Sequence, residues 1–556
     1  MTENRKKDNF IKQATILAAA GIIVRIIGLL YRSPLTAIIG DEGNGYYSFA
    51  YNIYTIILLI ASYSIPSAIS KVMAQKMAVG EYRNAQRLFY CAILYVVVIG
   101  GIASVFAYVA APVLVVANAV PVLRIFAPTI FFSGLLGVFR GYYQAHRTMV
   151  PTSLSQIIEQ LLNAIVSIGA AWLFIRMAVT VSVRDAGDET LTAIRGAQGS
   201  AVGTGAGVLI GLVFMLLIYA KDRGKRKDEL ANDNGALESY RHLFKLLLMI
   251  VTPFILSTFI YNFSTSLNQT IYSNMMMRFR DMAQEEAASL YGIFSGKAVV
   301  IANIPIAFSA AMASAVIPGI SAAFAKGDLE GTSGRVRLAV KVTMLISIPS
   351  AVGLFVLSRP VMQLLFPQPA SLAMASLILR CLAVTVIFYG LSTLTNAVLQ
   401  GIGKVNAPVL HAALALVIQV IVLIGGLFLW ENSLFALAAA QITYSLSMCI
   451  LNARTVRSAI GYREQIGEIF VRPIAAALGM GCVAYLIYRG CYSLFLTGVH
   501  SDALSNALAL VVAILAAVVV YFVLIIKLGA VSEQELSGFP KGSMLVRMAK
   551  KLHLLA

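Results

Sequence analysis

Residues 14–38 read ATILAAAGIIVRIIGLLYRSPLTAI, an apolar run that carries Arg25 near its middle. About twenty consecutive apolar residues are enough for a helix to cross the hydrocarbon core of a bilayer. A permanent charge at that depth is costly, so it usually faces a protein interior or a water-filled cavity and marks a functional site. This run therefore predicts a membrane-spanning helix and makes Arg25 the first candidate site residue.

Similar runs fill the rest of the chain, of which 59% is hydrophobic and only 12% is charged. Hydropathy predicts about fourteen membrane spans. Their approximate bounds are 14–38, 48–69, 88–111, 119–139, 151–176, 197–220, 243–266, 291–317, 336–357, 373–398, 408–430, 434–453, 473–489 and 504–526. The predicted fold class is an all-α polytopic membrane protein, with little chain left for a soluble domain.

The distribution of charge predicts the orientation of these spans. Most of the 43 Lys and Arg residues lie in the two tails and in the loops after even-numbered spans. The positive-inside rule therefore places both termini in the cytoplasm. The net charge of +18 is spread over separate cytoplasmic segments, which favours anionic membrane lipids as partners and argues against nucleic acid. We expect no cleavable signal peptide, because the first run is too long and Arg25 interrupts it.

Two parts of the chain echo each other. Six residues return later in the same order: Arg124, Ala127, Phe132, Gly134, Leu135 and Gln144 recur as Arg380, Ala383, Phe388, Gly390, Leu391 and Gln400. A repeat with an even number of spans gives parallel halves, related by an axis along the membrane normal. We therefore expect two pseudo-symmetric six-helix lobes around a central cavity, with two extra C-terminal helices.

This repeat predicts five segments along the chain. They are an N-lobe over 1–220, a cytoplasmic linker over 221–242, a C-lobe over 243–456, the two added spans over 457–527 and a cytoplasmic tail over 528–556. The linker joins a basic cluster to the polar stretch Asp228–Ser239, which lacks hydrophobic periodicity and is expected to be flexible. The tail places four apolar residues on one helical stripe: Leu545, Met548, Leu552 and Leu555. Such a stripe is typical of an interfacial amphipathic helix.

A longer motif spans the fourth-to-fifth-span connection. Residues 139–147 read FRGYYQAHR, and Pro151, Ser155, Gln156, Glu159 and Gln160 follow. With GYY at 45–47 and LQGIGK at 399–404, the pattern resembles the polysaccharide-transporter branch of the multidrug/oligosaccharidyl-lipid/polysaccharide exporter superfamily. Within that branch it is most similar to stage V sporulation protein B and the MurJ-type lipid II flippases. The resemblance covers essentially the whole chain.

This resemblance implies a transporter rather than an enzyme. An alternating-access flippase of this kind carries the headgroup of a polyprenyl-diphosphate-linked sugar from the cytoplasmic to the outer leaflet. The implied substrate is an undecaprenyl-diphosphate-linked glycan, here the peptidoglycan precursor lipid II, in a bacterial plasma membrane. We expect a monomer without a cofactor, and other cell-wall synthesis proteins are candidate partners.

The resemblance also suggests substrate-binding residues. Arg25, Ile26, Ile27 and Gly28 match a MurJ-like motif whose arginine lines the cavity, and the planar arginine fork suits a diphosphate; a buried structural ion pair is the alternative. Arg32 approximates a second family arginine, or snorkels to the outer surface. Lys297 stands where MurJ-type proteins tend to carry arginine, or anchors the helix at the interface. The family's second-span charges have no counterpart here.

Further polar residues remain open between functional and structural roles. Glu159 is the only carboxylate predicted inside a span, and it shares a helical face with Gln156 and Asn163. It is either a coupling site for a proton, sodium ion or substrate amide, or the charge partner of Arg25 or another internal base. Arg124 and Arg380 occupy repeat-related places near the outer ends of spans four and ten, which suggests lobe architecture first and substrate second.

Three other classes of function compete with the flippase. A multidrug antiporter of the same superfamily would be expected to present several acidic residues to a cation, and only Glu159 is available. A membrane glycosyltransferase would need acids or metal ligands near the sugar, but the histidines and the five cysteines show no metal-ligand spacing. A non-transporting wall or spore assembly protein could keep the fold, but it would be expected to lose charges such as Arg25.

Overall fold

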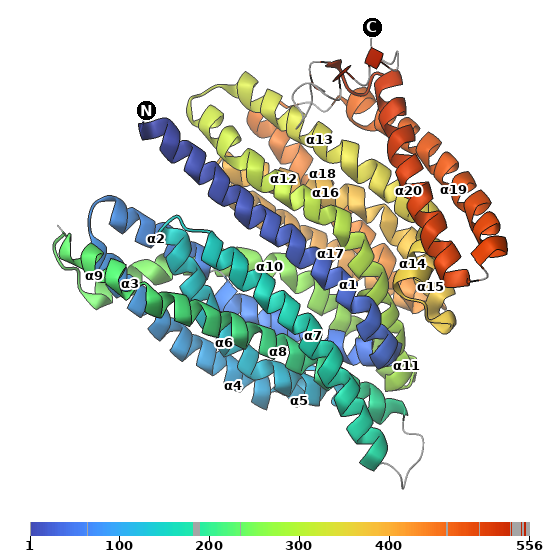
Figure 1. Ribbon diagram of the computed structural model, residues 1–556, viewed down its shortest axis with the longest axis horizontal. Helices are drawn as coiled ribbons and strands as arrows, with labels where there is room; N and C mark the ends of the chain where they lie inside the picture. The colour runs from blue at the N-terminus through green and yellow to red at the C-terminus, as the bar shows by residue number, and fades with distance from the viewer. Residues whose placement is uncertain are drawn as a thin grey trace. The chain divides into compact units, whose positions relative to one another are not determined.

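The computed structural model describes residues 2–63, 65–181, 189–233, 235–462, 465–499, 501–533, 535, 546–547 and 550–551. These parts form helices joined by short connections (Figure 1). Eleven of the described helices are long and apolar enough to cross a membrane, or twelve if the bent pair Pro369–Ala383 and Thr385–Gly401 forms one span. The all-helical, polytopic class predicted from the sequence is therefore confirmed.

The eleven candidate spans differ from the predicted fourteen at three places along the chain. One long element, α1 (Thr2–Leu58), runs through the first predicted span and the first half of the second. Predicted span 243–266 lies in α10 (Tyr240–Phe279), where residues 250–262 are outside the residues whose side chains are described, so the count of eleven does not test it. Predicted span 373–398 corresponds to the bent pair, whose two helices meet at 42°.

Gly40 interrupts α1 between its two predicted spans. Its φ of 70° and ψ of −178° are not helical, and this backbone region is one that residues with a side chain rarely adopt. The chain therefore changes direction at a residue that allows it. The apolar helix containing Arg25 leads through this bend directly into the polar, aromatic sequence that starts near Tyr46.

The chain divides into two compact units, Met1–Gly292 and Ile293–Ala556. Beyond α1 and α10, the first unit contains η1 (Leu59–Tyr63), α2 (Ile65–Ala78), α3 (Tyr82–Tyr95), η2 (Val96–Gly100), α4 (Gly101–Val109), α5 (Ala111–Leu114), η3 (Ala117–Ala119), α6 (Val120–Ala145), α7 (Val150–Val181), α8 (Glu189–Lys221), α9 (Arg223–Ala231) and α11 (Gln284–Tyr291). Figure 1 shows α7 and α8 running side by side, and they share an extensive interface.

The core of the first unit is centred on α2, α3 and α6. Phe89 of α3 is buried and packs against Phe139 and Tyr142 of α6 and Tyr219 of α8, with ring centroids 5.0 to 5.5 Å apart. Such offset and edge-on aromatic contacts add to the free energy gained by burying the rings. The FRGYYQAHR motif thus supplies core residues as well as charged ones.

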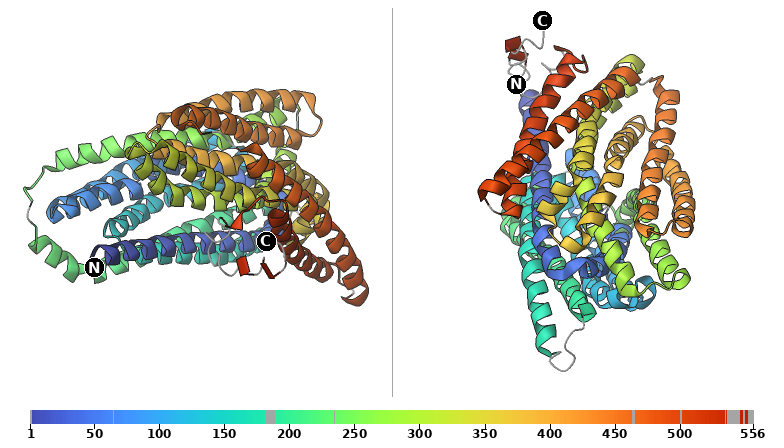
Figure 2. Two further views of the ribbon diagram at one scale, coloured as in Figure 1. Left: turned by 90° about the horizontal axis from the view of Figure 1, so that it is seen from above. Right: turned by 90° about the vertical axis from the view of Figure 1, so that its right-hand side faces the viewer.

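The second unit opens with the π-helical turn η5 (Gly292–Ala298), whose first residue closes the first unit, and continues through α12 (Val299–Ala325), α13 (Leu329–Val356), α14 (Ser358–Leu365), α15 (Pro369–Ala383), α16 (Thr385–Gly401), α17 (Asn406–Leu429), α18 (Ser433–Ile460), η6 (Gly467–Val471), α19 (Arg472–Val499) and α20 (Asp502–Lys527). Its largest core cluster joins α12, α13, α16 and α18. The last two helices form a hairpin, which Figure 2 shows in both views.

The division between the units falls at Gly292, whereas the repeat places the linker at 221–242. Polar contacts explain this, because α10 is bound to α1: the Asn52 amide donates to Gln269 Oε1 at 2.6 Å, and Gln269 donates to the Phe49 carbonyl at 2.9 Å. Part of the polar stretch is helical as α9. The apolar stripe predicted for the tail, Leu545, Met548, Leu552 and Leu555, lies outside the described residues.

Candidate functional site

Arg25 and Arg32 lie two helical turns apart on α1 and therefore on one face. Arg25 is exposed and Arg32 is half-buried. Between them, Gly28 lies against α7, where a Cβ added to it would be 3.2 Å from Gln160 Nε2. Further along, Ile39 of α1 and Ile175 of α7 both border Gly196, so the two helices run in the same direction. Arg25 is therefore placed one turn before Gln160, at the level of Gln156.

Arg32 contacts a column of aromatic rings. Its guanidinium carbon lies 5.7 Å from the centroid of the Tyr47 ring, within the range of a cation–π interaction. The column continues through Tyr51 and Tyr54, with successive centroids 5.6 and 5.8 Å apart, and Phe126 of α6 packs against all three rings. The Tyr47 ring thus covers one side of the guanidinium, and Arg32 lies at one end of the aromatic column.

Glu159 of α7 is paired with Arg140 of α6. Arg140 Nη2 donates to Glu159 Oε2 at 2.6 Å, and Arg140 Nε donates to Ser155 Oγ at 2.9 Å. The two charged side chains are 15% and 27% exposed. The charge partner of Glu159 in the structure is thus Arg140, the first arginine of the FRGYYQAHR motif, and Ser155 orients its guanidinium.

Asn163 belongs to a neighbouring group of polar side chains between α7 and α8. Its Oδ1 accepts from Ser167 Oγ at 2.9 Å and from Thr204 Oγ1 at 3.4 Å. Thr204 Oγ1 also lies 3.3 Å from the Tyr47 hydroxyl. Arg32, Tyr47, Thr204 and Asn163 therefore form one continuous series of contacts, while Gln156 is half-buried on the same face of α7 as Glu159.

A row of glycines on α8 allows this close arrangement. A Cβ on Gly203 would collide with the Ser167 backbone and hydroxyl, and one on Gly207 would lie 2.5 Å from the Glu159 carbonyl oxygen. A Cβ on Gly199 would likewise collide with the backbone of Ala171. Small residues spaced by four let two membrane helices approach backbone to backbone. The row therefore fixes the position of the α7 face that carries Glu159 and Asn163.

The remaining predicted residues have local partners of their own. Lys297, in η5 of the second unit, is 1% exposed, donates to Ser371 Oγ at 2.6 Å and lies 6.0 Å from the Phe366 ring centroid. Arg380 donates to Ser358 Oγ at 2.7 Å. Arg124, in the first unit, lies 5.3 Å over the Tyr108 ring.

Two features were missed by reasoning from the sequence alone. The first is the role of Arg140, whose position directly after predicted span four, at the cytoplasmic end, could have marked it as a base close to Glu159. The second is the aromatic column, which the spacing of Tyr47, Tyr51 and Tyr54 on one helical face could have revealed. Within the described residues, no group of three or more His, Cys, Asp or Glu side chains is placed to hold a metal ion.

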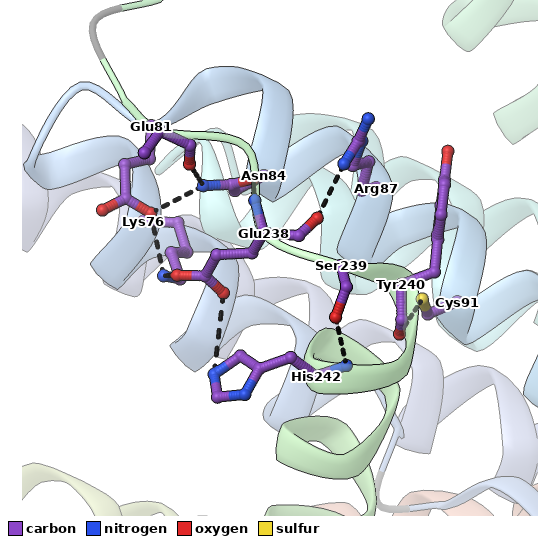
Figure 3. Close-up of polar contacts among 10 residues, drawn as sticks. Lys76, Glu81, Asn84, Arg87, Cys91, Glu238, Ser239, Tyr240 and His242 are labelled. Atoms are coloured by element: carbon purple, nitrogen blue, oxygen red, sulfur yellow. Dashed lines mark hydrogen bonds and ion pairs between the residues drawn. The ribbon is translucent and has the colours of Figure 1, made fainter.

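A second polar cluster ties the segment before α10 to α2 and α3 (Figure 3). Lys76 binds both Glu81, at 2.8 Å, and Glu238. Asn84 donates to the Ala236 carbonyl at 2.8 Å and accepts from the Glu238 amide at 3.0 Å. Arg87 donates to the Glu238 carbonyl at 2.6 Å. We call residues 233 and 235–239 the strap, because these bonds hold them across the α2–α3 turn.

Comparison with known proteins places this arrangement in a family. A family model described as lipid II flippase MurJ matches residues 82–504. The chain belongs to the MurJ family. It is therefore a multi-pass membrane transporter, and the resemblance predicted from the sequence is confirmed. Its MurJ-like motif at Arg25 lies before the matched range.

Curated relatives and solved structures agree with this family. Lipid II flippase MurJ of Bacillus subtilis (strain 168) is 24% identical over 73% of this chain and 75% of that protein. Stage V sporulation protein B of the same organism is 22% identical over 97% of this chain and all of that protein.

Among solved structures, a lipid II flippase MurJ in an inward closed conformation has a TM-score of 0.66, covering 92% of this chain and 98% of that one at 16% identity. An inward-facing multidrug resistance MATE family transporter of the MOP superfamily has a TM-score of 0.60, covering 79% and 94% at 16% identity. At these identities the likeness shows the shared MurJ and MATE fold.

Proposed function

We propose that the chain is a flippase that moves lipid II, an undecaprenyl-diphosphate-linked peptidoglycan precursor, from the inner to the outer leaflet by alternating access. Membership of the MurJ family supports a lipid-linked precursor as substrate. The proposal includes a bacterial plasma membrane location, about fourteen spans in two six-helix lobes plus two further helices, and both termini in the cytoplasm.

The observation that carries the proposal is the face of α1 on which Arg25 and Arg32 lie. Two guanidinium groups two turns apart suit a diphosphate, which offers two linked anionic groups and several acceptor oxygens. Arg25 is exposed at the surface of the chain, so its guanidinium is accessible to a ligand. Arg32 is held against Tyr47, so its position is set before a ligand arrives. We assign diphosphate binding first to Arg25, with Arg32 assisting.

The other candidate residues receive supporting roles. Lys297 is a third candidate for substrate binding, and its bond to Ser371 fixes the ammonium. Glu159 would tune the equilibrium between inward and outward states through its pair with Arg140, while Gln156 and Asn163 present amides on the same α7 face. Arg124 and Arg380 would stabilise the lobes at repeat-related positions. A substrate shifts such an equilibrium only through unequal affinity for the two states.

One contact argues against a cation antiporter, the main alternative within the shared fold. A cationic substrate or coupling ion would need a carboxylate that is free to bind it, and Glu159 already accepts a 2.6 Å bond from Arg140. The same contact does not separate lipid II from other polyprenyl-linked glycans, because both present the same diphosphate.

The test measures outer-leaflet exposure of lipid II in spheroplasts whose own flippase has been depleted. Four samples are compared at equal membrane expression: the wild-type chain, Arg25→Ala, Arg176→Ala and an empty vector. Arg176 is the matched control, because it is an exposed arginine in the same unit that stacks on Trp172, 4.3 Å from its ring centroid.

We expect the wild type and Arg176→Ala to restore outer-leaflet exposure of lipid II. With Arg25→Ala, that exposure should fall at least about tenfold, because the diphosphate loses one or more charge-assisted hydrogen bonds. No restoration by a well-expressed wild type would overturn lipid II as substrate. Restoration by Arg25→Ala equal to wild type would overturn the assigned binding residue while leaving the transport activity in place.

A further inference from the structure

A groove of about 450 Å³ opens at the C-terminal end of α8, a helix whose full length is a candidate membrane span. Its apolar wall is formed by Val213, Leu216, Leu217 and Ala220, all of which are exposed, and Leu217 has 66% of its surface accessible. Exposed apolar residues at the end of a membrane helix match the first methylenes of a lipid acyl chain. This part of the groove therefore suits a lipid rather than a soluble ligand.

The other end of the groove is basic. Arg223 and Arg226 line it, and the surrounding segment 221–227 contains five basic residues and one acidic residue. The acidic residue, Asp222, is already engaged, since it contacts Lys225 at 3.0 Å and accepts a 3.0 Å hydrogen bond from the Tyr143 hydroxyl. Positive charge therefore predominates where the apolar wall ends.

Arg226 is held in place at this junction. Its guanidinium carbon stacks 3.7 Å from the Tyr219 ring centroid, and Nη1 donates to the Tyr219 carbonyl. A planar guanidinium fixed in this way still has donors left, and its geometry matches phosphate oxygens. Just beyond, Glu229 approaches His146 at 3.3 Å, so this carboxylate is also occupied by a partner.

We propose that the α8–α9 groove binds the headgroup of an anionic phospholipid. Arg223 and Arg226 bind the phosphodiester, and the row from Val213 to Ala220 contacts the upper part of an acyl chain. Charge complementarity selects the occupant, because clusters of basic residues next to a membrane helix attract anionic lipids. The site lies away from the α1 face assigned to the transported substrate and does not depend on that assignment.

The test counts bound lipids on the purified full-length chain by native mass spectrometry. Phosphatidylglycerol is titrated against phosphatidylcholine with the same acyl chains, for the wild type and for the double variant Arg223→Gln/Arg226→Gln. The matched control, Arg454→Gln/Arg457→Gln, removes two exposed arginines near the end of the candidate span in α18. Thermal unfolding without lipid reports whether each variant is folded.

We expect the double variant to bind its tightest phosphatidylglycerol about thirtyfold more weakly, and the control to stay within about twofold of wild type. Arg223→Gln alone keeps the Arg226–Tyr219 stack and is expected to weaken binding about fivefold. Val213→Trp, which fills the groove, should lower binding with both arginines intact. The proposal is overturned if the double variant binds phosphatidylglycerol as tightly as the wild type does, or if the control variant loses as much affinity as the double variant. It is also overturned if the wild type binds phosphatidylcholine as tightly as phosphatidylglycerol.

Discussion

Arg140 of α6 donates a 2.6 Å hydrogen bond to Glu159 of α7, so the single carboxylate predicted inside a span forms an ion pair with a residue of the neighbouring helix. Ser155 receives a second bond from the same guanidinium, which fixes the fork in one orientation. Both charged side chains are mostly removed from solvent. The pair therefore joins α6 to α7 at the helix face that also carries Gln156 and Asn163.

Replacing Glu159 by Gln should destabilise the folded protein. The amide keeps the shape of the carboxylate but leaves Arg140 without a countercharge. A fully buried pair broken in this way costs more, and partial exposure reduces the effect to about 1–2 kcal/mol of unfolding free energy. The thermal unfolding midpoint in detergent should fall accordingly, and transport should be measured at matched expression.

The control is the double variant Arg140→Gln/Glu159→Gln, in which neither charge remains. It should recover part of the lost stability, because the two residues interact directly and their effects are not additive. If the double variant is as unstable as the sum of the two single variants, the pair does not contribute to the fold in the way described here.

Helix positions were largely predictable from the sequence, because the length of an apolar run is set by membrane thickness. The division of these helices into membrane spans was less predictable. The bend at Gly40 joins two predicted spans into α1, and a helix break divides predicted span 373–398 at 42°. Hydropathy reports how apolar a segment is and contains no information on such local backbone angles.

The candidate site was predictable only one helix at a time. The charge on Arg25 and the carboxylate of Glu159 stand out in the sequence, because each is rare at that depth. The partner of Glu159 does not, because a pair such as Arg140 and Glu159 depends on how two helices are rotated against each other. Similarly, the strap is polar and lacks periodicity, so only its bonds to Lys76, Asn84 and Arg87 reveal that it is held in place.

Gly207→Ala should destabilise the α7–α8 interface. The added Cβ would lie 2.5 Å from the Glu159 carbonyl oxygen and 3.1 Å from Asn163 Cβ, so the backbones must separate. Overpacking of this kind typically costs about 1–3 kcal/mol. The thermal unfolding midpoint should fall, and transport should fall with it because Glu159 and Asn163 move.

The matched control is Gly169→Ala on α7, where an added Cβ meets nothing within 4 Å. This substitution should leave the midpoint unchanged or raise it, because alanine favours a helix over glycine by up to about 1 kcal/mol. Equal midpoints for the two variants would contradict the proposed role of the glycine row.

The cluster around Lys76 should make stability depend on pH. The bond from Lys76, with a second from Asn84, holds the pKa of the Glu81 carboxyl below its usual range. Burial lowers the pKa of the Lys76 ammonium, but its bonds to Glu238 and Glu81 outweigh burial and raise it overall. The Glu81 contribution is therefore present above the ordinary glutamate pKa of about 4.3 and is lost as pH falls through the lower folded value. The Lys76 contribution is present below about pH 10.4 and is lost as pH rises through the higher folded value.

Thermal unfolding of the wild type and of Glu81→Gln should differ at neutral pH and converge on acidification from about pH 7 to about pH 3. Glu330→Gln, which changes an exposed glutamate in the first turn of α13, serves as the control and should show no such convergence. A constant difference between wild type and Glu81→Gln across the whole range would show that the carboxylate is not stabilised by Lys76.

Variants at Lys297 and at its partner Ser371 can separate a structural role of the buried ammonium from a role in transport. Its ammonium is buried and bound to Ser371, so Ser371→Ala should cost about 1–3 kcal/mol by removing one hydrogen-bond acceptor from a charged donor. Lys297→Met removes the charge itself and keeps a long apolar side chain, so it should not lower the unfolding midpoint.

If the charge of Lys297 contributes to diphosphate binding, Lys297→Met should transport lipid II at least about tenfold more slowly while remaining folded. Lys326→Met, at an exposed lysine that follows α12, is the charge-matched control and should transport normally. Normal transport by Lys297→Met would remove Lys297 from the binding site and leave the two arginines of α1 to bind the diphosphate without it. A fall in both stability and transport would instead identify the buried ammonium as part of the packing of the second unit.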